Sequence, residues 1–480
     1  MPEDASGNRR PRRRVGFDSA TDAQTELTQV RNLLGIPDDD DVETRRKIAD
    51  LIAEAIGKKT KLPDVEETRR LVKAGADVSD DPRMDEVLEA FLATKLKAVE
   101  RGKLARNTYR SYESHDRLYL RPHLGGIRQR KLRVHHLDSM YEAIIENNER
   151  IAEFRQSGDQ VKIAAVKWQR PVGPTSLHKI NGTLKTVLSP AEKSGILLAN
   201  VAKLVELPAL IRPTPLVWTP ERVLLWRQTG LKPGPVMVWT PDQTGVFLDV
   251  AVNHPLYPLF HVIAHVGLRR GEACGQRRSE CYLDAGTLNV TNQIVQWGWE
   301  TAQTKPKTTN SEGIVALDAD SVLVLRLHLA LQDADKARLG SDWHENDLMF
   351  PRSDGSPLHP AEVTDAFYDI VERASLPPIR LHDLRHGAAT LALAAGVEMK
   401  VVQNMLRHSS ITTTSDIYTS VLPQVAFAAA EATAAIIPRQ SARSLGLFSG
   451  SHVPDSVEVF AQVDRAKGGS AEGWRGGRLL

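Results

Sequence analysis

The sequence predicts a mainly helical protein with one small antiparallel β-sheet, an α+β fold divided over more than one domain. The 480 residues exceed the roughly 150 that a single domain usually holds, so two or three domains are expected. Apolar residues recur at helical spacing over most of the chain. The segments GTLNVTNQIVQW and GIVALD instead alternate with the period of two that is typical of strands.

Composition narrows the class of protein. The 62 basic and 60 acidic residues give a net charge of +2, so net charge alone indicates no nucleic-acid partner. The only cysteines, Cys274 and Cys281, lie seven apart and fit neither a disulfide framework nor a zinc site. No window approaches the roughly 18 apolar residues of a membrane span, and the basic N-terminus lacks the apolar core of a signal peptide. We therefore expect a cytoplasmic protein with no membrane partner, associated with the nucleoid if it binds DNA.

Residues 1–84 are a charged N-terminal accessory segment. They contain a basic run between Arg9 and Arg14, an acidic run from Asp38 to Asp41, and two stretches with helical periodicity. This composition favours a solvated tail that is partly disordered, with an arm that touches DNA phosphates as the alternative.

Residues 85–210 show helical periodicity and predict a compact helical domain. Thr175 and Ser176 are candidate caps of its last helix, which continues through Pro190. Residues 211–240 then form a proline-rich, basic linker.

The linker contains two similar phrases, VWTPERV from Val217 and VWTPDQT from Val238. Each places threonine before proline, as at the start of a helix, and the second opens a domain at residues 241–437. Within that domain the segment from Glu300 to Asn310 reads as a hairpin loop between strands. Residues 438–480 are a Gly-rich tail, typical of disorder.

Polar residues are densest in the phrase HDLRH, which stands directly before a small, apolar helix. Burying an unpaired charge is costly, so these side chains need partners or a function. His382 and His386 have the spacing of a zinc-protease helix, with Asp383 in place of its glutamate. Arg385, however, would place a cation beside the metal, and no obvious third ligand follows. A zinc hydrolase remains as an alternative.

The second interpretation of the phrase is a phosphate site. His382 and Arg385, three residues apart, share one helix face, and both donate hydrogen bonds. A phosphate suits arginine because the planar guanidinium binds two oxygens at once. Other cationic residues should then converge on the same anion, and the candidates are Arg269 or Arg270 in GLRRGE, Lys305 and Lys307 in TKPKTT, and His408 in LRHSS.

The order of the phrases GLRRGE, PKTT, HDLRH, LRHSS and DIYTSV resembles the catalytic domain of the tyrosine recombinases, the phage-integrase family. The preceding helical region resembles that family's core DNA-binding domain, which is SAM-like. The resemblance covers roughly residues 85–437 and implies a C-shaped clamp around DNA.

By this resemblance, Arg269 and Arg385 would clamp the scissile phosphate, and Glu272 would hold Arg269 in place. Tyr418 would be the nucleophile. Lys307 would protonate the leaving oxygen as general acid, with Lys305 as the alternative. His382 and His408 would donate hydrogen bonds and assist proton transfer, whereas Asp383 and His386 are left to packing and supporting hydrogen bonds.

Two phrases depart from the family pattern. The family usually has Pro-Lys-Thr-Lys where this chain has PKTT, and Leu-Gly-His where it has Leu406, Arg407 and His408. A turn that glycine would ease must then be made by arginine. Either His408 is displaced, or Arg407 adds a phosphate contact.

Further residues are candidates for DNA contact, although each is equally compatible with an ordinary exposed role. They are Arg106, Asn107, Arg110, Lys179, Lys185, Arg212 and Lys305.

The resemblance implies a site-specific recombinase that integrates or excises a mobile element through a 3'-phosphotyrosyl intermediate, with no cofactor or metal. The N-terminal segment favours an integrase of a phage or conjugative element over a chromosome-dimer resolvase. Expected partners are double-stranded DNA attachment sites and further copies of the chain in a tetramer on DNA, with room for an excision factor or a DNA-bending host protein. The other alternative is a DNA-binding protein of the same family with impaired catalysis.

Overall fold

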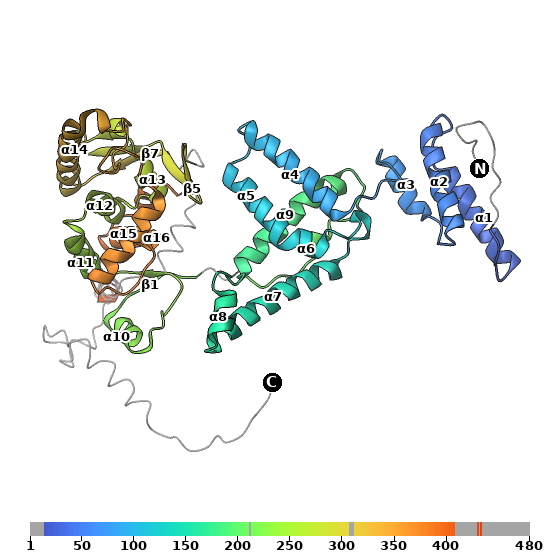
Figure 1. Cartoon of the computed structure of the whole chain (residues 1–480), viewed down its shortest axis with the longest axis horizontal. Coiled ribbons are helices and arrows are strands. Elements are labelled where there is room, and N and C mark those ends of the chain that lie inside the picture. The colour runs from blue at the N-terminus through green and yellow to red at the C-terminus, as the bar shows by residue number, and fades with distance from the viewer. Residues whose placement is uncertain (1–13, 211–212, 307–311, 409–429, 432, 434–480) are drawn as a thin grey trace, which may run out of the picture. The chain divides into compact units, whose positions relative to one another are not determined.

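The computed structural model describes residues 14–210, 213–306, 312–408, 430–431 and 433. The chain divides into two compact units, Met1–Arg212 and Pro213–Leu480 (Figure 1). In the described part of the chain, every named strand belongs to the second unit, and no helix is long and apolar enough to cross a membrane. Mainly helical secondary structure with small antiparallel sheets confirms the predicted fold class.

The first unit begins with three helices, where the sequence pattern predicted two and a solvated tail. Their N-caps are Ser19, Asp41 and Asp64, each of which accepts a backbone N–H of the first turn. The three helices share a small apolar core. The composition of the segment did not indicate this core, because charged surface residues dominate it. The helices are α1 (Ala20–Leu34), α2 (Val42–Gly57) and α3 (Val65–Lys73), and the core includes Leu33, Ile48, Ile52 and Leu71.

The rest of the first unit is a second helical bundle with its own core. Its last helix begins at Pro174 with Gly173 as N-cap and no side-chain cap, so the predicted caps Thr175 and Ser176 are wrong. Proline suits the first helical position because its missing N–H has no acceptor there. The elements are α4 (Met84–Glu100), α5 (Arg106–His115), the π-helix η1 (Asp116–Leu120), α6 (Arg121–Leu124), η2 (Gln129–Lys131), α7 (Val134–Gln156), α8 (Gln160–Val166), α9 (Pro174–Lys193) and η3 (Val201–Lys203).

The second unit opens with the two VWTP phrases, which form equivalent structures. Val217 lies opposite Val238 in a two-stranded parallel sheet, and the tryptophan after each valine is buried. Thr219 and Thr240 then cap the following helices, which confirms the two predicted helix starts. The elements are β1 (Leu216–Val217), α10 (Pro220–Thr229), β2 (Met237–Val238) and α11 (Pro241–Ala251).

The strands of this unit form two further small antiparallel sheets. Strand β4 pairs with β3 and β7, and β5 pairs with β6 in a hairpin whose turn contains Gly298 at φ 65°. Residues 300–304, expected to be loop, are therefore a strand. The elements are η4 (Arg278–Glu280), β3 (Cys281–Tyr282), β4 (Thr287–Val290), β5 (Gln293–Trp297), β6 (Glu300–Thr304) and β7 (Gly313–Ala316).

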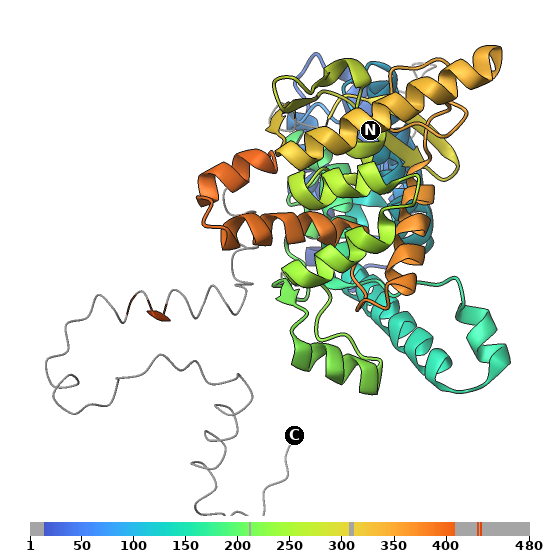
Figure 2. The same ribbon diagram turned by 90° about the vertical axis from the view of Figure 1, so that its left-hand side faces the viewer.

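Helices build the core of the second unit around an aromatic cluster. Phe247 lies 5.3 Å from Phe367 and 5.7 Å from Phe260 between ring centroids, and all three are fully buried. Burial of each such side chain stabilises the folded state by about 1.5–3 kcal/mol. Helix α12 contacts both α16 and the long helix α14 (Figures 1 and 2). The helices are α12 (Tyr257–Val266), α13 (Arg270–Gly275), α14 (Ala319–Leu339), η6 (Gly340–Asp342), α15 (Pro360–Arg373), α16 (Leu381–Ala394) and α17 (Met399–Met405).

Candidate active site

The corner between α12 and α13 positions the first candidate arginine. Gly267 ends α12 in the left-handed region, at φ 71°. A side chain is excluded there for a second reason, because a Cβ would lie 2.6 Å from Cδ2 of Leu406. Arg269 follows in extended backbone as the N-cap of α13. Arg270 is bound elsewhere and donates from Nη1 to Oγ1 of Thr364 at 2.6 Å.

Glu272 is buried beside Arg269 and completes the helix cap. Its Oε2 accepts the backbone N–H of Arg269 at 2.9 Å, and its Oε1 accepts Nη1 of the same residue at 2.5 Å. The Glu272 side chain is 1% exposed, whereas that of Arg269 is 35% exposed. Burial raises the pKa of Glu272, but Arg407 and Arg269 outweigh burial and hold that pKa below its ordinary value. The carboxylate is therefore ionised at neutral pH, while part of the Arg269 side chain reaches solvent.

A glycine lets α13 lie directly against strand β5. A Cβ on Gly275 would be 2.5 Å from Cα of Gln293, which is closer than real side chains approach. The β5–β6 hairpin is thus fixed to the helix that begins beside Arg269. The chain leaves this hairpin at Lys305, which is exposed and whose carbonyl accepts from Gln293.

Helix α16 carries the HDLRH phrase, and a salt bridge closes its first turn. Asp383 is 1% exposed and accepts from Nε and Nη2 of Arg380 at 2.8 and 2.6 Å, as well as from its backbone N–H. This arrangement caps the helix. Asp383 is thus committed to Arg380 rather than free to act as the base of a zinc hydrolase. Among the described residues, no group of three His, Cys, Asp or Glu side chains could hold a metal ion.

Arg385 lies deep within the site. It is 2% exposed, and its Nη1 and Nη2 donate to the carbonyls of Gly267 and Leu406, which join the ends of α12 and α17. A guanidinium carries five N–H donors, so these two bonds do not exhaust it. Burial first, and then the nearby Arg269, lower the pKa of Arg385 to about 9. The buried positive charge is therefore poorly compensated.

The turn after α17 brings the phrase Leu-Arg-His next to Arg385. Arg407 adopts φ 53°, its N–H donates to the carbonyl of Asn404 at 2.9 Å, and the N–H of His408 donates to that of Gln403 at 3.1 Å. This is a Schellman turn, the helix ending that glycine usually makes. A left-handed residue with a Cβ costs about 1 kcal/mol. The arginine therefore makes the turn that glycine would have eased.

The side chain of Arg407 turns inward. Arg407 is 5% exposed, and its Nη2 donates to Oε2 of Glu272 at 2.6 Å. The structure thus pairs the Arg407 guanidinium with a buried carboxylate, and a phosphate contact by Arg407 stays an expectation from the sequence. The pair joins residues 135 positions apart, so no motif spacing in the sequence could have identified it.

Two candidate histidines are neutral at physiological pH. Burial, followed by Arg385 and Arg269, lowers the pKa of His408 to about 3. Part of the His382 ring reaches solvent, yet the protein packed around it removes enough hydration to lower its pKa to about 4, with His386 and Arg385 adding to the effect. A neutral imidazole donates one hydrogen bond and accepts another. Each ring could thus hold an oxygen or pass a proton without adding charge.

These residues together form a cluster of positive charge that would suit an oxyanion. Arg269 and Arg407 both bind the carboxylate of Glu272, and the nearby charge of Arg385 joins them in lowering its pKa. Of the remaining predicted residues, Lys307, Tyr418 and Arg212 lie outside the described part of the chain.

The candidate DNA contacts of the first unit lie on two helices that touch. Arg106, Asn107 and Arg110 are exposed on α5, while Lys179 is exposed and Lys185 half-buried on α9. The two helices are joined by a 2.7 Å hydrogen bond between Nδ1 of His115 and Oγ1 of Thr183.

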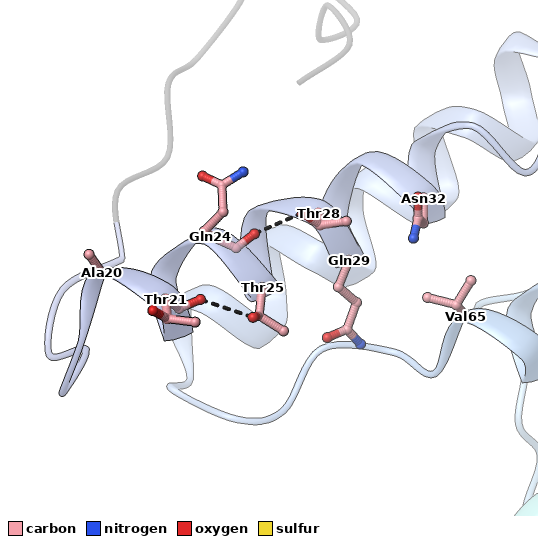
Figure 3. A pocket seen from close by; sticks show the side chains of 8 residues that line it. All are labelled: Ala20, Thr21, Gln24, Thr25, Thr28, Gln29, Asn32 and Val65. Carbon is pink, nitrogen blue, oxygen red and sulfur yellow. Dashed lines mark hydrogen bonds between the residues drawn. The ribbon is translucent and has the colours of Figure 1, made fainter.

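A separate hollow lies beside α1 (Figure 3). One face of α1, with Gln24, Thr28 and Asn32, lines it together with Val65 of α3. Its lining carries no acid, base or charged side chain, so the hollow offers no chemistry comparable to the arginine site.

Comparisons with known proteins fit this geometry. Residues 242–424 match the model described as the phage integrase family. A tyrosine recombinase XerC-like protein of Caldanaerobacter subterraneus is 25% identical over 269 residues, 54% of this chain and 65% of that protein. An integrase of Saccharopolyspora erythraea is 38% identical over 90 residues, 19% of this chain and 20% of that protein. The chain thus spans less than two thirds of the length of each of these two relatives.

The fold has known counterparts as well. A Tn1549 transposon integrase in complex with transposon right end DNA aligns with a TM-score of 0.51 at 15% identity, over 73% of this chain and 99% of that one. This similarity supports the fold, while the matched family model supports the assignment made from the five sequence phrases. Residues 242–424 of the chain therefore match the phage integrase family, and the XerC-like relative is a tyrosine recombinase to which the chain is similar.

Proposed function

We propose that the protein is a site-specific DNA recombinase, an integrase that cuts and rejoins strands through a 3'-phosphotyrosyl intermediate to integrate or excise a mobile element. The observation that supports this proposal best is the convergence of Arg269, Arg385 and His408 from three separate segments on one positively charged site. A phosphodiester is the ligand that such a site suits.

The scissile phosphate would lie between Arg269 and Arg385. Its non-bridging oxygens gain negative charge in the transition state, and charge-assisted bonds from preorganised guanidinium groups strengthen as they do so. His382 and His408, both neutral at pH 7, would donate further hydrogen bonds to these oxygens and relay the tyrosine proton.

Tyr418 would be the nucleophile. Its phenolic oxygen attacks phosphorus in line, the bond from phosphorus to the 5'-oxygen breaks, and Lys307, or Lys305 in its place, gives a proton to the leaving oxygen. The new phosphotyrosyl ester retains the energy of the broken bond. Attack by the 5'-hydroxyl of another strand then reverses the step, so no ATP is consumed.

Both units would contribute to DNA binding. Exposed cations on α5 and α9 are the candidate contacts of the first unit, and Lys305 is a candidate of the second. Binding should weaken steeply with salt because each phosphate contact releases counterions. Synapsis of two attachment sites would use a tetramer of the chain, and an excision factor or a DNA-bending host protein would set the direction.

A nicked duplex that carries the presumed attachment site tests the proposal. Incubation without divalent metal should give a covalent protein–DNA adduct on a denaturing gel. Tyr418→Phe should abolish the adduct, while the control Tyr282→Phe, which alters an exposed tyrosine of β3, should retain it.

Other outcomes would favour the alternatives. Salt-sensitive duplex binding without an adduct would indicate a DNA-binding protein of the family with impaired catalysis. Hydrolysis that requires stoichiometric zinc and stops with a chelator would indicate the zinc hydrolase.

A further inference from the structure

We infer that Arg407 is a positioning residue, the permanent counter-ion of Glu272, whose presence releases Arg269 to bind an oxyanion. The inference deepens the proposed function and rests on it for the identity of that oxyanion, a DNA phosphate. It concerns the one residue at which the Leu-Arg-His phrase departs from Leu-Gly-His.

The guanidinium groups of the two arginines bind different oxygens of the same carboxylate. Arg269 donates from Nη1 to Oε1 at 2.5 Å, whereas Arg407 donates from Nη2 to Oε2 at 2.6 Å. Their exposures differ sharply, with 35% of the Arg269 side chain exposed against 3% for Arg407. Arg269 can therefore move towards a ligand while Arg407 stays.

The backbone at position 407 is strained, and the side chain there is directed inward. Three non-glycine residues in the described chain have positive φ, namely Lys59, Ser375 and Arg407, and each follows the C-cap of a helix. Lys59 and Ser375 are exposed, whereas Arg407 is buried. The strain at position 407 thus accompanies a buried ion pair, which glycine could not supply.

Charge balance explains why the pair matters. If Arg269 turned to a phosphate without Arg407, Glu272, at 1% exposure, would be left as a buried carboxylate beside an anion. Such a carboxylate is strongly disfavoured and would either take up a proton or hold Arg269 back. With Arg407 in place, Glu272 stays ionised and paired while Arg269 and Arg385 both face the ligand.

The ionisable groups that act on Glu272 come from three segments. They are Arg269 at the start of α13, Arg385 on α16 and Arg407 after α17. Arg270, on the same helix, is bound instead to Thr364 of α15. Removing Arg407 should therefore couple oxyanion binding to proton uptake by Glu272.

Sulfate binding, measured by calorimetry at pH 7 in two buffers of different ionisation enthalpy, tests this coupling. The wild type should bind sulfate without net proton uptake. Arg407→Met should bind at least tenfold more weakly, take up as much as one proton, and recover affinity as the pH falls towards 6. In the Glu272→Gln background, Arg407→Met should change affinity by less than threefold and show no proton uptake.

Two further variants keep the test decisive. Arg407→Gly relieves the left-handed strain and should show the same proton uptake, which covers the case in which the methionine variant does not fold. Arg278→Met removes the exposed ion pair with Asp333 and should bind sulfate as the wild type does. On a saturating nicked duplex, Arg407→Met should slow adduct formation at least tenfold with unchanged duplex affinity.

The outcomes separate this inference from the proposed function. Sulfate binding with the expected proton coupling but no adduct in the wild type would sink the recombinase proposal and leave the role of Arg407 intact. Wild-type sulfate affinity without proton uptake in Arg407→Met and Arg407→Gly would overturn the inference. Failure of the wild type to bind sulfate would also overturn it. So would an equal loss of sulfate affinity when Arg407→Met is made in the Glu272→Gln background.

Discussion

Arg385→Met should abolish oxyanion binding yet leave the free energy of unfolding within about 2 kcal/mol of the wild type, because two opposing effects nearly cancel. Arg385 is 2% exposed and holds the carbonyls of Gly267 and Leu406. Methionine has a similar length and no charge, so it fills the space without replacing the donors.

The magnitudes follow from the surroundings. Losing two hydrogen bonds from a charged donor costs about 1.5–3 kcal/mol each, or about 3–6 kcal/mol together. Against this, burial and then Arg269 lower the pKa of Arg385 to about 9, well below its ordinary value. At about 1.4 kcal/mol per pKa unit, the folded protein disfavours this charge by about 5 kcal/mol, which the substitution recovers.

Urea unfolding at pH 7, with and without sulfate, measures both parts of the prediction. Sulfate should stabilise the wild type and the control Arg270→Met, whose arginine is bound to Thr364, but not Arg385→Met. A loss of more than about 4 kcal/mol would mean that the carbonyl bonds outweigh the charge penalty. Equal stabilisation of all three proteins by sulfate would show that Arg385 does not bind the anion.

Three further predictions concern stability. Gly275→Ala should lower the free energy of unfolding in urea by at least about 2 kcal/mol, because its Cβ would lie 2.5 Å from Cα of Gln293. The control Gly245→Ala, with open space around it, should stabilise slightly. Equal effects of the two substitutions would argue against the close packing of α13 on β5. Thr240→Ala should cost about 1 kcal/mol through loss of its N-cap bond, and no loss would contradict that cap. Burial holds the pKa of His261 at about 4, below the 6.5 of an unfolded histidine, so the unfolded state binds the extra proton and stability is lost as the pH falls from about 6.5 to 4. His261→Gln should therefore lose about 2 kcal/mol less than the wild type between pH 7 and 5, and parallel pH curves would refute this.

The sequence predicted those features that depend on interactions between residues close together in the chain. Thr219 and Thr240 precede prolines at helix starts, and the structure places a cap at each. His382 and Arg385 fall in the first turns of one helix, α16, as their spacing indicated. Such features depend on neighbours within four residues, which the sequence displays directly.

Other features depend on contacts that the sequence does not display. Residues 300–304, ETAQT, lack apolar alternation because none of them is buried, so only pairing with β5 makes them a strand. The N-terminal helices carry a charged surface over a small core, and charge dominated the interpretation of their composition. The Arg407–Glu272 pair joins distant segments, so the sequence marked Arg407 as unusual but not its partner.

Two features that cost stability in the second unit lie at the site. The pKa of Arg385 is lowered, and Arg407 adopts a left-handed backbone that disfavours a side chain. A fold selected for stability alone would place glycine at 407 and an apolar residue at 385. Excess positive charge destabilises the folded protein, but a bound anion neutralises part of that charge. Anion binding therefore raises the free energy of unfolding that the buried charge had lowered. On this argument the unliganded site is preorganised for a phosphate at the expense of its own stability, and anions should stabilise the second unit by more than general salt effects explain.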